Sequence, residues 1–461
     1  MQAFLYPSAR TYKQLTLLAA LFMLLPIFTM QYIGEEGLMA IKSYEMFVRG
    51  DWLHPSILGG VWPHSPLWHW PVILISQIIG WTHVDIAVRL VSVIASYLTA
   101  LSVGFTARWL FQRTDIAWLA ALIYLSIGEV AFWYGWLGYV DATFALFIFS
   151  AIAALWRALE DESALWFLAA LSLISLAFLT KNITAYALFG ASGLIFLWRL
   201  NRWQLFKTIW FVPLSLMALS VPVLWQGFIA AGGNTATVSI NDVLRNFAGH
   251  TPLDFIKHWV TFPFVFLFRA LPVSLFLAWL WLKKRQQFTL DQTTSTLLSL
   301  LLICFLPFWI SAGATPRYLV PLYGIVALLI TSLTLQLDNR RLKQVVMLIA
   351  LFVLLKIPYS LLALPYIKDW RPERDVKVVA QEIMHLTEHA PLRTQNDVAT
   401  GLAIAAYIDV WRQQRPPIHW YDGKERGVYI LTEVEEPSFG QLVKNWRVRG
   451  SHIYLYWNAA P

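Results

Sequence analysis

Charged residues are scarce in this sequence, and cysteine is almost absent. Only 13% of the 461 residues are charged and 58% are hydrophobic, whereas soluble domains carry about 25% charged residues. This composition excludes an ordinary soluble protein and indicates an integral membrane protein. The single cysteine, Cys304, excludes a disulfide within the chain and a thiolate metal cluster.

Charge is concentrated at the C-terminal end. Residues 366–461 hold 24 charged side chains in 96 positions, whereas residues 1–365 hold 38 in 365. Only this tail has the charge density of a soluble domain. The net charge of +8 does not indicate a nucleic-acid partner, because most basic residues occupy short loops between apolar runs, as the positive-inside rule explains.

Long apolar runs fill the first 365 residues. A bilayer core needs about 20 apolar residues per helix, which predicts about eleven transmembrane helices. The predicted spans are 15–33, 86–110, 117–134, 142–158, 164–179, 183–200, 208–230, 260–282, 296–311, 318–337 and 345–364. Residues 39–48 and 66–80 predict two short interfacial helices, and Gly50 is expected to end the first of them.

Basic residues set the expected orientation, because every second loop carries them. They are Arg108, Arg113, Arg157, Arg199, Arg202, Lys207, Lys283, Lys284, Arg285, Arg340, Arg341 and Lys343. The N-terminus is therefore expected in the cytoplasm, with Arg10 and Lys13 preceding a retained first helix. An odd number of spans then puts the tail outside.

The tail alternates helix-like and strand-like runs, which predicts a small α/β domain. Its predicted helices are 376–388 and 398–413, and its predicted strands are 417–421, 427–431 and 452–457. The expected fold is thus an all-α polytopic membrane domain, 1–365, followed by an extracytoplasmic α/β domain, 366–461. Two outer loops of the first domain are long: 34–85, and 232–258, a candidate lid.

Acids and bases gather at the predicted outer ends of the spans. Charged side chains that persist in or beside spans usually face a cavity or a partner. The outer-side set is Glu35, Glu36, Asp141, Lys181, Arg245, Arg269 and Arg317. Such a mixture suits a pocket that holds a phosphate and abstracts a proton.

Several of these residues also have simpler structural interpretations. Glu35, Glu36 and Asp141 could stabilise helix N-termini through their charge. Lys181 could extend from a helix end towards the interface. Arg269 lies inside its predicted span and is expected to pair with an acid rather than to take part in catalysis.

Other candidates have equally plain alternatives. Arg317 could be an interfacial anchor, and Trp62 and Trp68 fit an aromatic belt near span ends. His64 fits an ordinary loop position better than a metal site, since no His/Asp/Glu group has convincing metal-ligand spacing. The alternative for the tryptophans near the acids is that a sugar stacks on their rings.

The first predicted outer loop resembles that of a known enzyme class. The segments concerned are Glu35-Glu36-Gly37, Tyr44-Glu45-Met46, Gly50-Asp51-Trp52, Gly60-Val61 and Pro66-Leu67-Trp68-His69-Trp70. They are similar to the first periplasmic loop of the aminoarabinose transferase and protein O-mannosyltransferase families, which are polytopic glycosyltransferases of the GT-C fold. Similar segments follow in order, at Asp141, Leu179-Thr180-Lys181, residues 242–247 and Arg317-Tyr318-Leu319-Val320-Pro321.

The resemblance covers about residues 10–340 and has two departures. The family places an aspartate 15 residues before the glycine that matches Gly50, where this chain has Glu35. The family's loop lysine is replaced by His64, which removes a fixed positive charge and leaves the identity of donor and acceptor open.

The resemblance implies transfer of a sugar from a polyprenyl phosphate to an acceptor on the outer face of a bacterial inner membrane. Glu35 is the expected base, with Asp141 and Glu36 as further catalytic residues. Lys181, Arg245 and Arg317 are expected to hold the donor phosphate, and His64, Trp62 and Trp68 to contact sugar or acceptor.

The acceptor stays open between lipid A or lipopolysaccharide, another glycan and a protein, and membrane lipids are the remaining partners. No cofactor is assigned, and a divalent metal stays open. A transporter or flippase of a lipid-linked sugar is the main alternative, although no internal inverted repeat is found. A scaffold subunit without activity is a third.

Overall fold

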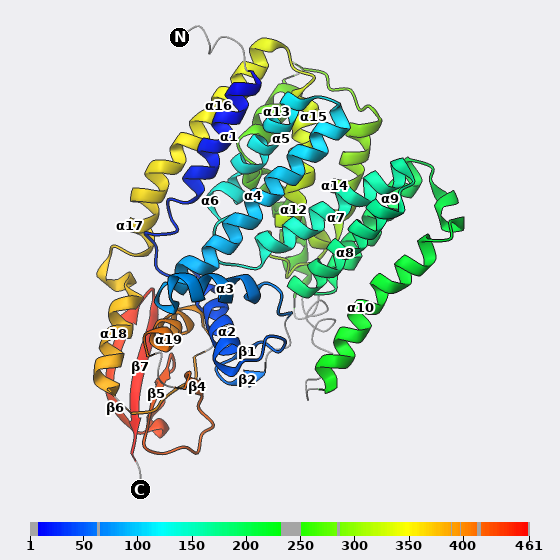
Figure 1. The fold of residues 1–461 in the computed structure, drawn as a ribbon. Helices are drawn as coiled ribbons and strands as arrows, with labels where there is room; N and C mark the ends of the chain where they lie inside the picture. The colour runs from blue at the N-terminus through cyan, green and yellow to red at the C-terminus, as the bar shows by residue number, and fades with distance from the viewer. Residues whose placement is uncertain are drawn as a thin grey trace. The chain divides into compact units, whose positions relative to one another are not determined.

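The computed structural model describes residues 8–61, 65–231, 250–283, 286–388, 390–396, 398–412 and 416–459. The chain forms two compact units, whose elements are labelled in Figure 1. Unit 1 comprises Met1–Leu24, Ser92–Trp136 and Val140–Ile357, and unit 2 comprises Leu25–Val91, Leu137–Tyr139 and Pro358–Pro461. Unit 2 thus contains the first predicted outer loop as well as the tail. The predicted division into domains 1–365 and 366–461 stays a prediction.

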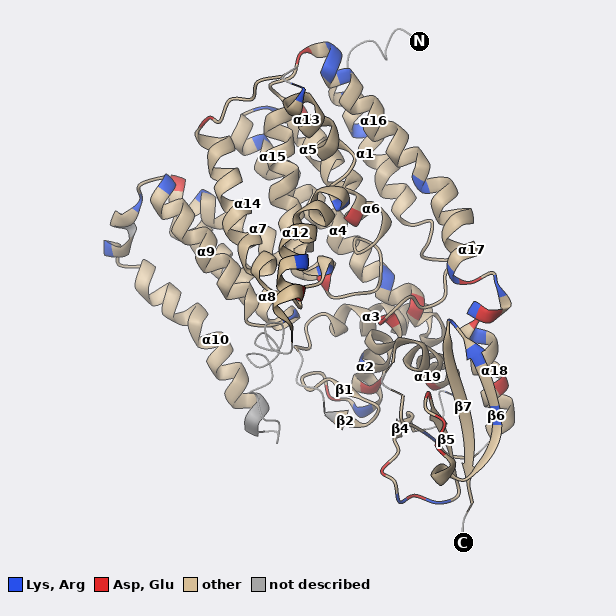
Figure 2. Cartoon of the chain, turned by 180° about the vertical axis from the view of Figure 1, so that it is seen from behind, with Lys and Arg blue, Asp and Glu red and all other residues tan. Residues whose placement is uncertain are grey.

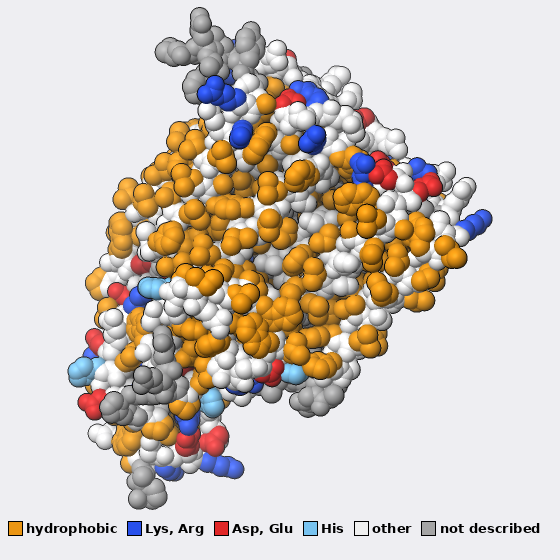
Figure 3. All heavy atoms as spheres, viewed as in Figure 1, with side chains coloured by type: hydrophobic (Ala, Val, Ile, Leu, Met, Phe, Trp, Pro, Cys, Tyr) orange, Lys and Arg blue, Asp and Glu red, His pale blue; other side chains and the backbone are white. Residues whose placement is uncertain are grey.

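Unit 1 is helical. Its helices are α1 (Ala9–Met23), the second half of α4 (Val84–Phe111), α5 (Thr114–Ser126), α6 (Gly128–Phe132), α7 (Asp141–Asp161), α8 (Ala164–Thr180), α9 (Thr184–Arg199), α10 (Phe211–Ala231), α12 (Pro252–Arg269), α13 (Val273–Leu282), α14 (Gln292–Ile310), α15 (Tyr323–Thr334) and α16 (Asn339–Pro358). Two 3₁₀ segments, η3 (Trp203–Lys207) and η4 (Pro316–Leu322), connect them. Hydrophobic side chains cover most of the face of these helices seen in Figure 3, as expected for helices that contact lipid.

Among the described residues, six helices are long and apolar enough to cross a membrane, or seven if the bent pair α12 and α13 counts as one span. The chain is therefore a mostly helical, multi-pass membrane protein. Figure 2 shows that few charged residues lie along the middle of these helices. The number is below the eleven predicted partly because α1, α8 and α9 have only 15, 17 and 16 residues.

Two predicted spans are interrupted, which corrects the sequence prediction, and a third is continuous but begins as a 3₁₀ segment. The run 117–134 breaks between α5 and α6, where Gly128 N–H donates to Leu271 O at 2.8 Å instead of continuing the helix. The run 260–282 bends by 114° between α12 and α13, just before Val273, where Pro272 has no N–H to offer. The run 318–337 begins as the 3₁₀ segment η4, which contains Pro321.

The N-terminal part of unit 2 holds the two predicted interfacial helices. They are α2 (Glu36–Arg49) and α3 (His69–Ile79), with the strands β1 (Ser56–Ile57) and β2 (Gly60–Val61) between them and η2 (Trp81–His83) after them. Gly50 ends α2 in the left-handed conformation, with φ 66°, as the sequence predicts.

The C-terminal part of unit 2 is a mixed sheet with two main helices. It contains η5 (Tyr359–Ala363), α17 (Leu364–Lys368), η6 (Pro372–Arg374), α18 (Val376–Thr387), β3 (Leu392–Thr394), α19 (Ala399–Trp411), β4 (His419–Trp420), β5 (Val428–Thr432), η7 (Pro437–Phe439), β6 (Gln441–Val448) and β7 (Ser451–Asn458). The strand order is β4-β3-β5-β7-β6, parallel between β3 and its two neighbours and antiparallel elsewhere. The small α/β fold of the tail is confirmed, with β3 and β6 as strands that the sequence did not predict.

The helix α19 packs closely on α2. A Cβ atom added at Gly37 would lie 2.7 Å from Ala403 Cα, so the two backbones touch where α2 has glycine and α19 has alanine. Almost all of α19 is buried, which its apolar sequence requires. The helix that begins at Glu36 is thus fixed against the tail within one compact unit.

Candidate functional site

Glu36 is a fully buried acid whose carboxylate is saturated with donors. It accepts from Ile33 N–H at 2.7 Å, from Gly138 N–H at 2.7 Å, and from Arg89 Nε and Nη2 at 3.0 and 2.6 Å. A carboxylate has about four lone-pair sites, so none is left for a substrate. Glu36 and Arg89 are both inaccessible to solvent, and the geometry assigns Glu36 to holding the loop.

Glu35 has different surroundings from Glu36. It is the N-cap of α2, is half-buried, and uses its backbone N–H to bond Tyr139 Oη at 2.7 Å. The preceding Gly34 has φ +58°, a left-handed conformation that favours glycine. Glu35 makes no side-chain cap bond to the start of α2.

Lys42 is a buried base two helical turns after Glu35. Only 2% of it is exposed. Burial lowers the pKa of Lys42 to about 7, and the negative charge of Glu35 opposes that shift. The electrostatic coupling indicates that Lys42 and Glu35 share one face of α2.

A second charged cluster lies in unit 1, at the ends of α7 and α8. Asp141, the first residue of α7, pairs with Lys181, the C-cap of α8, at 2.5 Å between Oδ1 and Nζ. Lys181 Nζ also lies 5.4 Å from the ring centre of Phe144 and 4.8 Å from that of Tyr318. The guanidinium of Arg317 lies 5.6 Å from the same Tyr318 ring. Tyr318 therefore has a cation–π contact with each of two basic residues.

The cluster extends to the bend between α12 and α13. Arg269 forms an ion pair with the buried Glu129 of α6, so the expected structural pairing of Arg269 is found. It is the last residue of α12 and not an interior residue of a span. Tyr134 is within electrostatic range of both members of this pair and of Asp141.

The unit 1 cluster carries an excess of positive charge. Its bases are Lys181, Arg269 and Arg317, and its acids are Asp141 and Glu129. Lys181 is 19% exposed, whereas Asp141 is only 2% exposed. An accessible cation held by a buried acid beside two aromatic rings is suited to binding an anionic headgroup.

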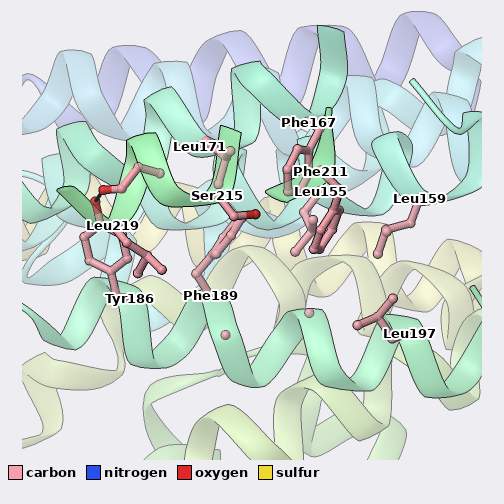
Figure 4. A pocket seen from close by; sticks show the side chains of 13 residues that line it. Leu155, Leu159, Phe167, Leu171, Tyr186, Phe189, Leu197, Phe211, Ser215 and Leu219 are labelled. Carbon is pink, nitrogen blue, oxygen red and sulfur yellow. Dashed lines mark hydrogen bonds between the residues drawn. The ribbon is translucent and has the colours of Figure 1, made fainter. Parts of the chain in front are cut away.

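An apolar cavity of about 220 Å³ lies between α7, α8, α9 and α10 (Figure 4). Its wall includes Leu171, Phe189 and Gly190, and no charged residue lines it. Tyr186 is on its edge, with its hydroxyl donating to Ala218 O at 2.8 Å. Lys181 caps α8, three residues before α9 begins at Thr184, and Tyr186 is the lining residue nearest to it in the sequence.

The structure divides the predicted site residues into three groups. It brings Asp141, Lys181 and Arg317 together in unit 1, and it places Glu35 and Glu36 at the start of α2 in unit 2. Trp68 is fully buried, with its ring edge-on to His69 at 5.2 Å between centroids, and its sugar contact stays a prediction. Trp62, His64 and Arg245, with most of the predicted lid, lie outside the described residues.

Sequence reasoning missed Arg89, Glu129, Lys42 and Tyr139. Arg89 and Glu129 each stand within a predicted apolar span, and a charge in such a run is a signal for a buried partner. Lys42 and Tyr139 give no such signal, because their neighbours are fixed only by the fold. Among the described residues, no group of three or more His, Cys, Asp or Glu is placed to hold a metal ion.

Comparisons with known proteins bear on the fold and on the resemblance found in the sequence. The sequence profile of the dolichyl-phosphate-mannose-protein mannosyltransferase family matches residues 63–225. The crystal structure of ArnT from Cupriavidus metallidurans bound to undecaprenyl phosphate superimposes with a TM-score of 0.72 at 14% identity, covering 97% of this chain and 98% of that one. The chain has the GT-C fold of ArnT. The resemblance to the aminoarabinose transferases and protein mannosyltransferases is confirmed.

Curated relatives of this GT-C chain carry one description. The undecaprenyl phosphate-α-4-amino-4-deoxy-L-arabinose arabinosyl transferase 2 of Proteus mirabilis is 26% identical over 341 residues, 68% of this chain and 58% of its own length. The corresponding transferase of Pseudomonas aeruginosa is 28% identical over 317 residues, 65% of this chain and 54% of its own. The GT-C chain thus matches a little over half the length of these relatives.

Proposed function

We propose that this protein transfers a sugar from a polyprenyl phosphate to an acceptor on the extracytoplasmic face of a bacterial inner membrane, with inversion at the sugar carbon. The observation that carries the proposal is the cluster of Asp141, Lys181 and Arg317, an accessible pair of cations beside a buried acid. The matches to transferases that use such donors support the same class of reaction.

The two cations would bind the leaving phosphate. The Arg317 guanidinium can present two N–H groups to phosphate oxygens, while Lys181 supplies a point charge. Asp141 already binds Lys181 Nζ, which fixes the ammonium group before the donor arrives. As the glycosidic bond breaks, negative charge grows on the phosphate and both contacts strengthen. Arg245 is proposed as a third phosphate ligand.

Glu35 is the proposed base. Transfer with inversion requires removal of the acceptor hydroxyl proton while the acceptor oxygen attacks the sugar carbon and the lipid phosphate leaves. Glu35 occupies the place of the acid fifteen residues before Gly50 in the similar families, whereas the carboxylate of Glu36 already accepts four hydrogen bonds. Glu36 is therefore proposed to position the loop, and Asp141 to orient the phosphate-binding lysine.

The cavity of unit 1 would hold part of the polyprenyl tail. Its lining is mostly apolar and includes residues of α8 and α9, the two helices on either side of Lys181. A phosphate on Lys181 would therefore direct the attached hydrocarbon along α9. Burying each methylene would contribute about 0.8 kcal/mol.

The membrane arrangement that we propose keeps the sequence-based topology. About eleven spans, with short or broken helices such as α1, α8 and the α12–α13 pair counted as crossings, give a cytoplasmic N-terminus and an extracytoplasmic tail. The acceptor is proposed to be lipid A or a related glycan or protein on that face. The sugar is proposed to be aminoarabinose or a similar residue, by analogy with the relatives.

Binding of undecaprenyl phosphate to the purified protein in nanodiscs tests the donor half of the proposal. Lys181→Ala and Arg317→Ala should each weaken binding about 10- to 150-fold, since hydrogen bonds to charged groups contribute about 1.5–3 kcal/mol. Lys207→Ala, an exposed lysine in η3, is the matched control and should bind as the wild type does. Equal affinity in all three variants would remove the cluster from the donor site.

Sugar transfer from undecaprenyl-phosphate-linked 4-amino-4-deoxy-L-arabinose to lipid A tests the reaction. Product containing the labelled sugar, with release of undecaprenyl phosphate, is expected. Movement of the intact donor across proteoliposomes without any product would instead identify a flippase.

A further inference from the structure

Residues 31–33, just before Glu35, have no regular secondary structure, yet all six of their backbone polar groups are hydrogen-bonded. Side chains form a bond to each of them. Arg89 Nη2 donates to Gln31 O at 2.7 Å, Glu36 accepts from Ile33 N–H at 2.7 Å, and the Tyr139 hydroxyl donates to Ile33 O at 3.3 Å. A buried irregular segment needs such partners, because an unpaired backbone group is costly.

The other three bonds come from the C-terminal part of unit 2. Asp369 Oδ2 accepts from Gln31 N–H at 2.9 Å, and Tyr407 Oη accepts from Tyr32 N–H at 3.1 Å. Arg449 Nη1 donates to Tyr32 O at 2.5 Å. Half of the backbone bonds that place this segment are therefore supplied by residues more than 300 positions away in the sequence.

Arg449 is the most constrained of these partners. It is in the tight turn between β6 and β7, with φ 54°, and its side chain is 12% exposed. Its backbone N–H donates to Glu373 O at 2.7 Å, and Nε donates to Arg374 O at 3.1 Å. Its Nη2 lies 3.4 Å from Asp369 Oδ1. Arg449 and Asp369 therefore bind each other as well as the segment, Asp369 at the Gln31 N–H and Arg449 at the Tyr32 carbonyl.

The side chain of Gln31 ties the same segment to the start of α18. Its Nε2 donates to Asp375 Oδ1 at 2.9 Å, and its Oε1 accepts from Val376 N–H at 3.0 Å. Asp375 is itself the N-cap of α18. A shift of the segment would therefore break a helix cap as well as the contacts of Arg449.

We propose that Arg449 is a positioning residue for Glu35, so that the C-terminal part of unit 2 sets the place of the proposed base. This inference rests on the proposed function. Tyr32, whose carbonyl Arg449 holds, is three residues before Glu35, and Gly34 between them has φ +58°. A displacement of about 1 Å at a reacting group can cost roughly a hundredfold in rate.

Hydrogen–deuterium exchange on the full-length protein tests the positioning without any substrate. In Arg449→Met, the amides of residues 31–36 should exchange at least about tenfold faster than in the wild type. Arg449→Lys, which keeps the charge but not the planar fork, should give an intermediate rate. Arg447→Met, at an exposed arginine on β6 two residues before Arg449, is the matched control and should leave these amides unchanged. Wild-type exchange in Arg449→Met would overturn the proposal.

Single-turnover transfer with saturating undecaprenyl-phosphate-linked aminoarabinose tests the link to Glu35. Arg449→Met should lower the rate about 10- to 100-fold with little change in the donor concentration for half saturation. If Arg449 acts through Glu35, the double variant with Glu35→Gln should be no slower than Glu35→Gln alone. If the rate of the double variant instead falls by the product of the two single-variant reductions, Arg449→Met causes a general structural defect, and the proposal is overturned.

The outcomes separate this inference from the proposed function. If Glu35→Gln transfers sugar at the wild-type rate, the base assigned in the proposed function is wrong, whatever Arg449 does. If Glu35→Gln is inactive while Arg449→Met is fully active, only the positioning role is wrong.

Discussion

At the scale of single residues, neighbours in the sequence have opposite roles. Glu35 and Glu36 are adjacent acids of the same type, yet one is half-buried with no side-chain cap bond and the other is enclosed by four donors. The sequence predicts that acids at this loop matter, but it cannot distinguish them. The distinction depends on Arg89 and Gly138, which only the fold places beside Glu36.

Glu35→Gln keeps the shape of the side chain but cannot accept a proton. Turnover should fall about 10²–10⁴-fold, the usual effect of losing a general base, with donor affinity little changed. Glu35→Asp should retain partial activity, above that of the glutamine variant, because the carboxylate remains but is displaced by one methylene. Single-turnover transfer measures both, after gel filtration confirms folding. A wild-type rate for Glu35→Gln would pass the role of base to another acid.

Glu36→Gln should act mainly on stability. It leaves the charge of Arg89 buried without a counter-ion, and breaking a buried pair in this way costs about 3–5 kcal/mol. The unfolding midpoint in detergent should drop clearly. Glu373→Gln, from the more exposed pair with Arg371 at 3.5 Å, is the control and should change little. Equal unfolding midpoints for the two variants would contradict the role assigned to the four hydrogen bonds of the Glu36 carboxylate.

The pKa of Lys42 predicts a pH dependence of stability. It is about 7 in the folded protein and 10.5 in an ordinary setting, because burial disfavours the charged form. Between these values the unfolded chain binds more protons, so stability should rise as pH increases from about 7 towards 10. Below pH 7 this residue contributes no slope, since both states are protonated.

Thermal unfolding across this pH range measures the effect. Lys42→Met should remove the rise, while Lys424→Met, at an exposed position, should keep it. An unchanged slope in Lys42→Met would show that another group is responsible.

At the scale of elements, hydropathy predicts helices well and their interruptions poorly. The runs 86–110, 142–158 and 164–179 match α4, α7 and α8 to within three residues at each end, because length and apolar content decide a membrane helix. The breaks near Gly128 and Pro272 were not predicted. They depend on tertiary hydrogen bonds and on proline within runs that are otherwise continuous. The strand β6 was missed because it is exposed at a sheet edge and shows no buried stripe.

The apolar cavity between α7, α8, α9 and α10 leads to a prediction at the same scale. A side chain added at Gly190 of α9 meets no atom within 4 Å of its Cβ, so Gly190→Leu should fold and fill part of the space. The donor concentration for half-maximal rate should rise about tenfold, since displacing about two methylenes costs about 1.6 kcal/mol, with the rate at saturation unchanged.

Gly227→Leu is the matched control for the cavity variant. Gly227 is on α10, also with nothing within 4 Å, but it does not line the cavity. Equal donor dependence in both variants would show that the tail binds elsewhere.

At the scale of the whole molecule, the side of the membrane on which the tail lies is the main prediction from the basic loops. Ser438→Cys, placed in η7 on a Cys304→Ala background, should react with a membrane-impermeant thiol reagent added to intact spheroplasts. Cys304 itself is buried, and the Cys304→Ala parent alone is the control. Labelling of Ser438→Cys only after lysis would place the tail in the cytoplasm.

The bond between Arg449 and Tyr32 spans 417 positions of the chain, and this has a consequence for biosynthesis. A ribosome makes Tyr32 417 positions before Arg449, so the segment before Glu35 must wait with half of its backbone partners not yet made. Chains that stall before Arg449 would form their first helices but keep an unfinished loop. The proposed sugar transfer would thus begin only once the turn between β6 and β7 has been made and has folded against this loop.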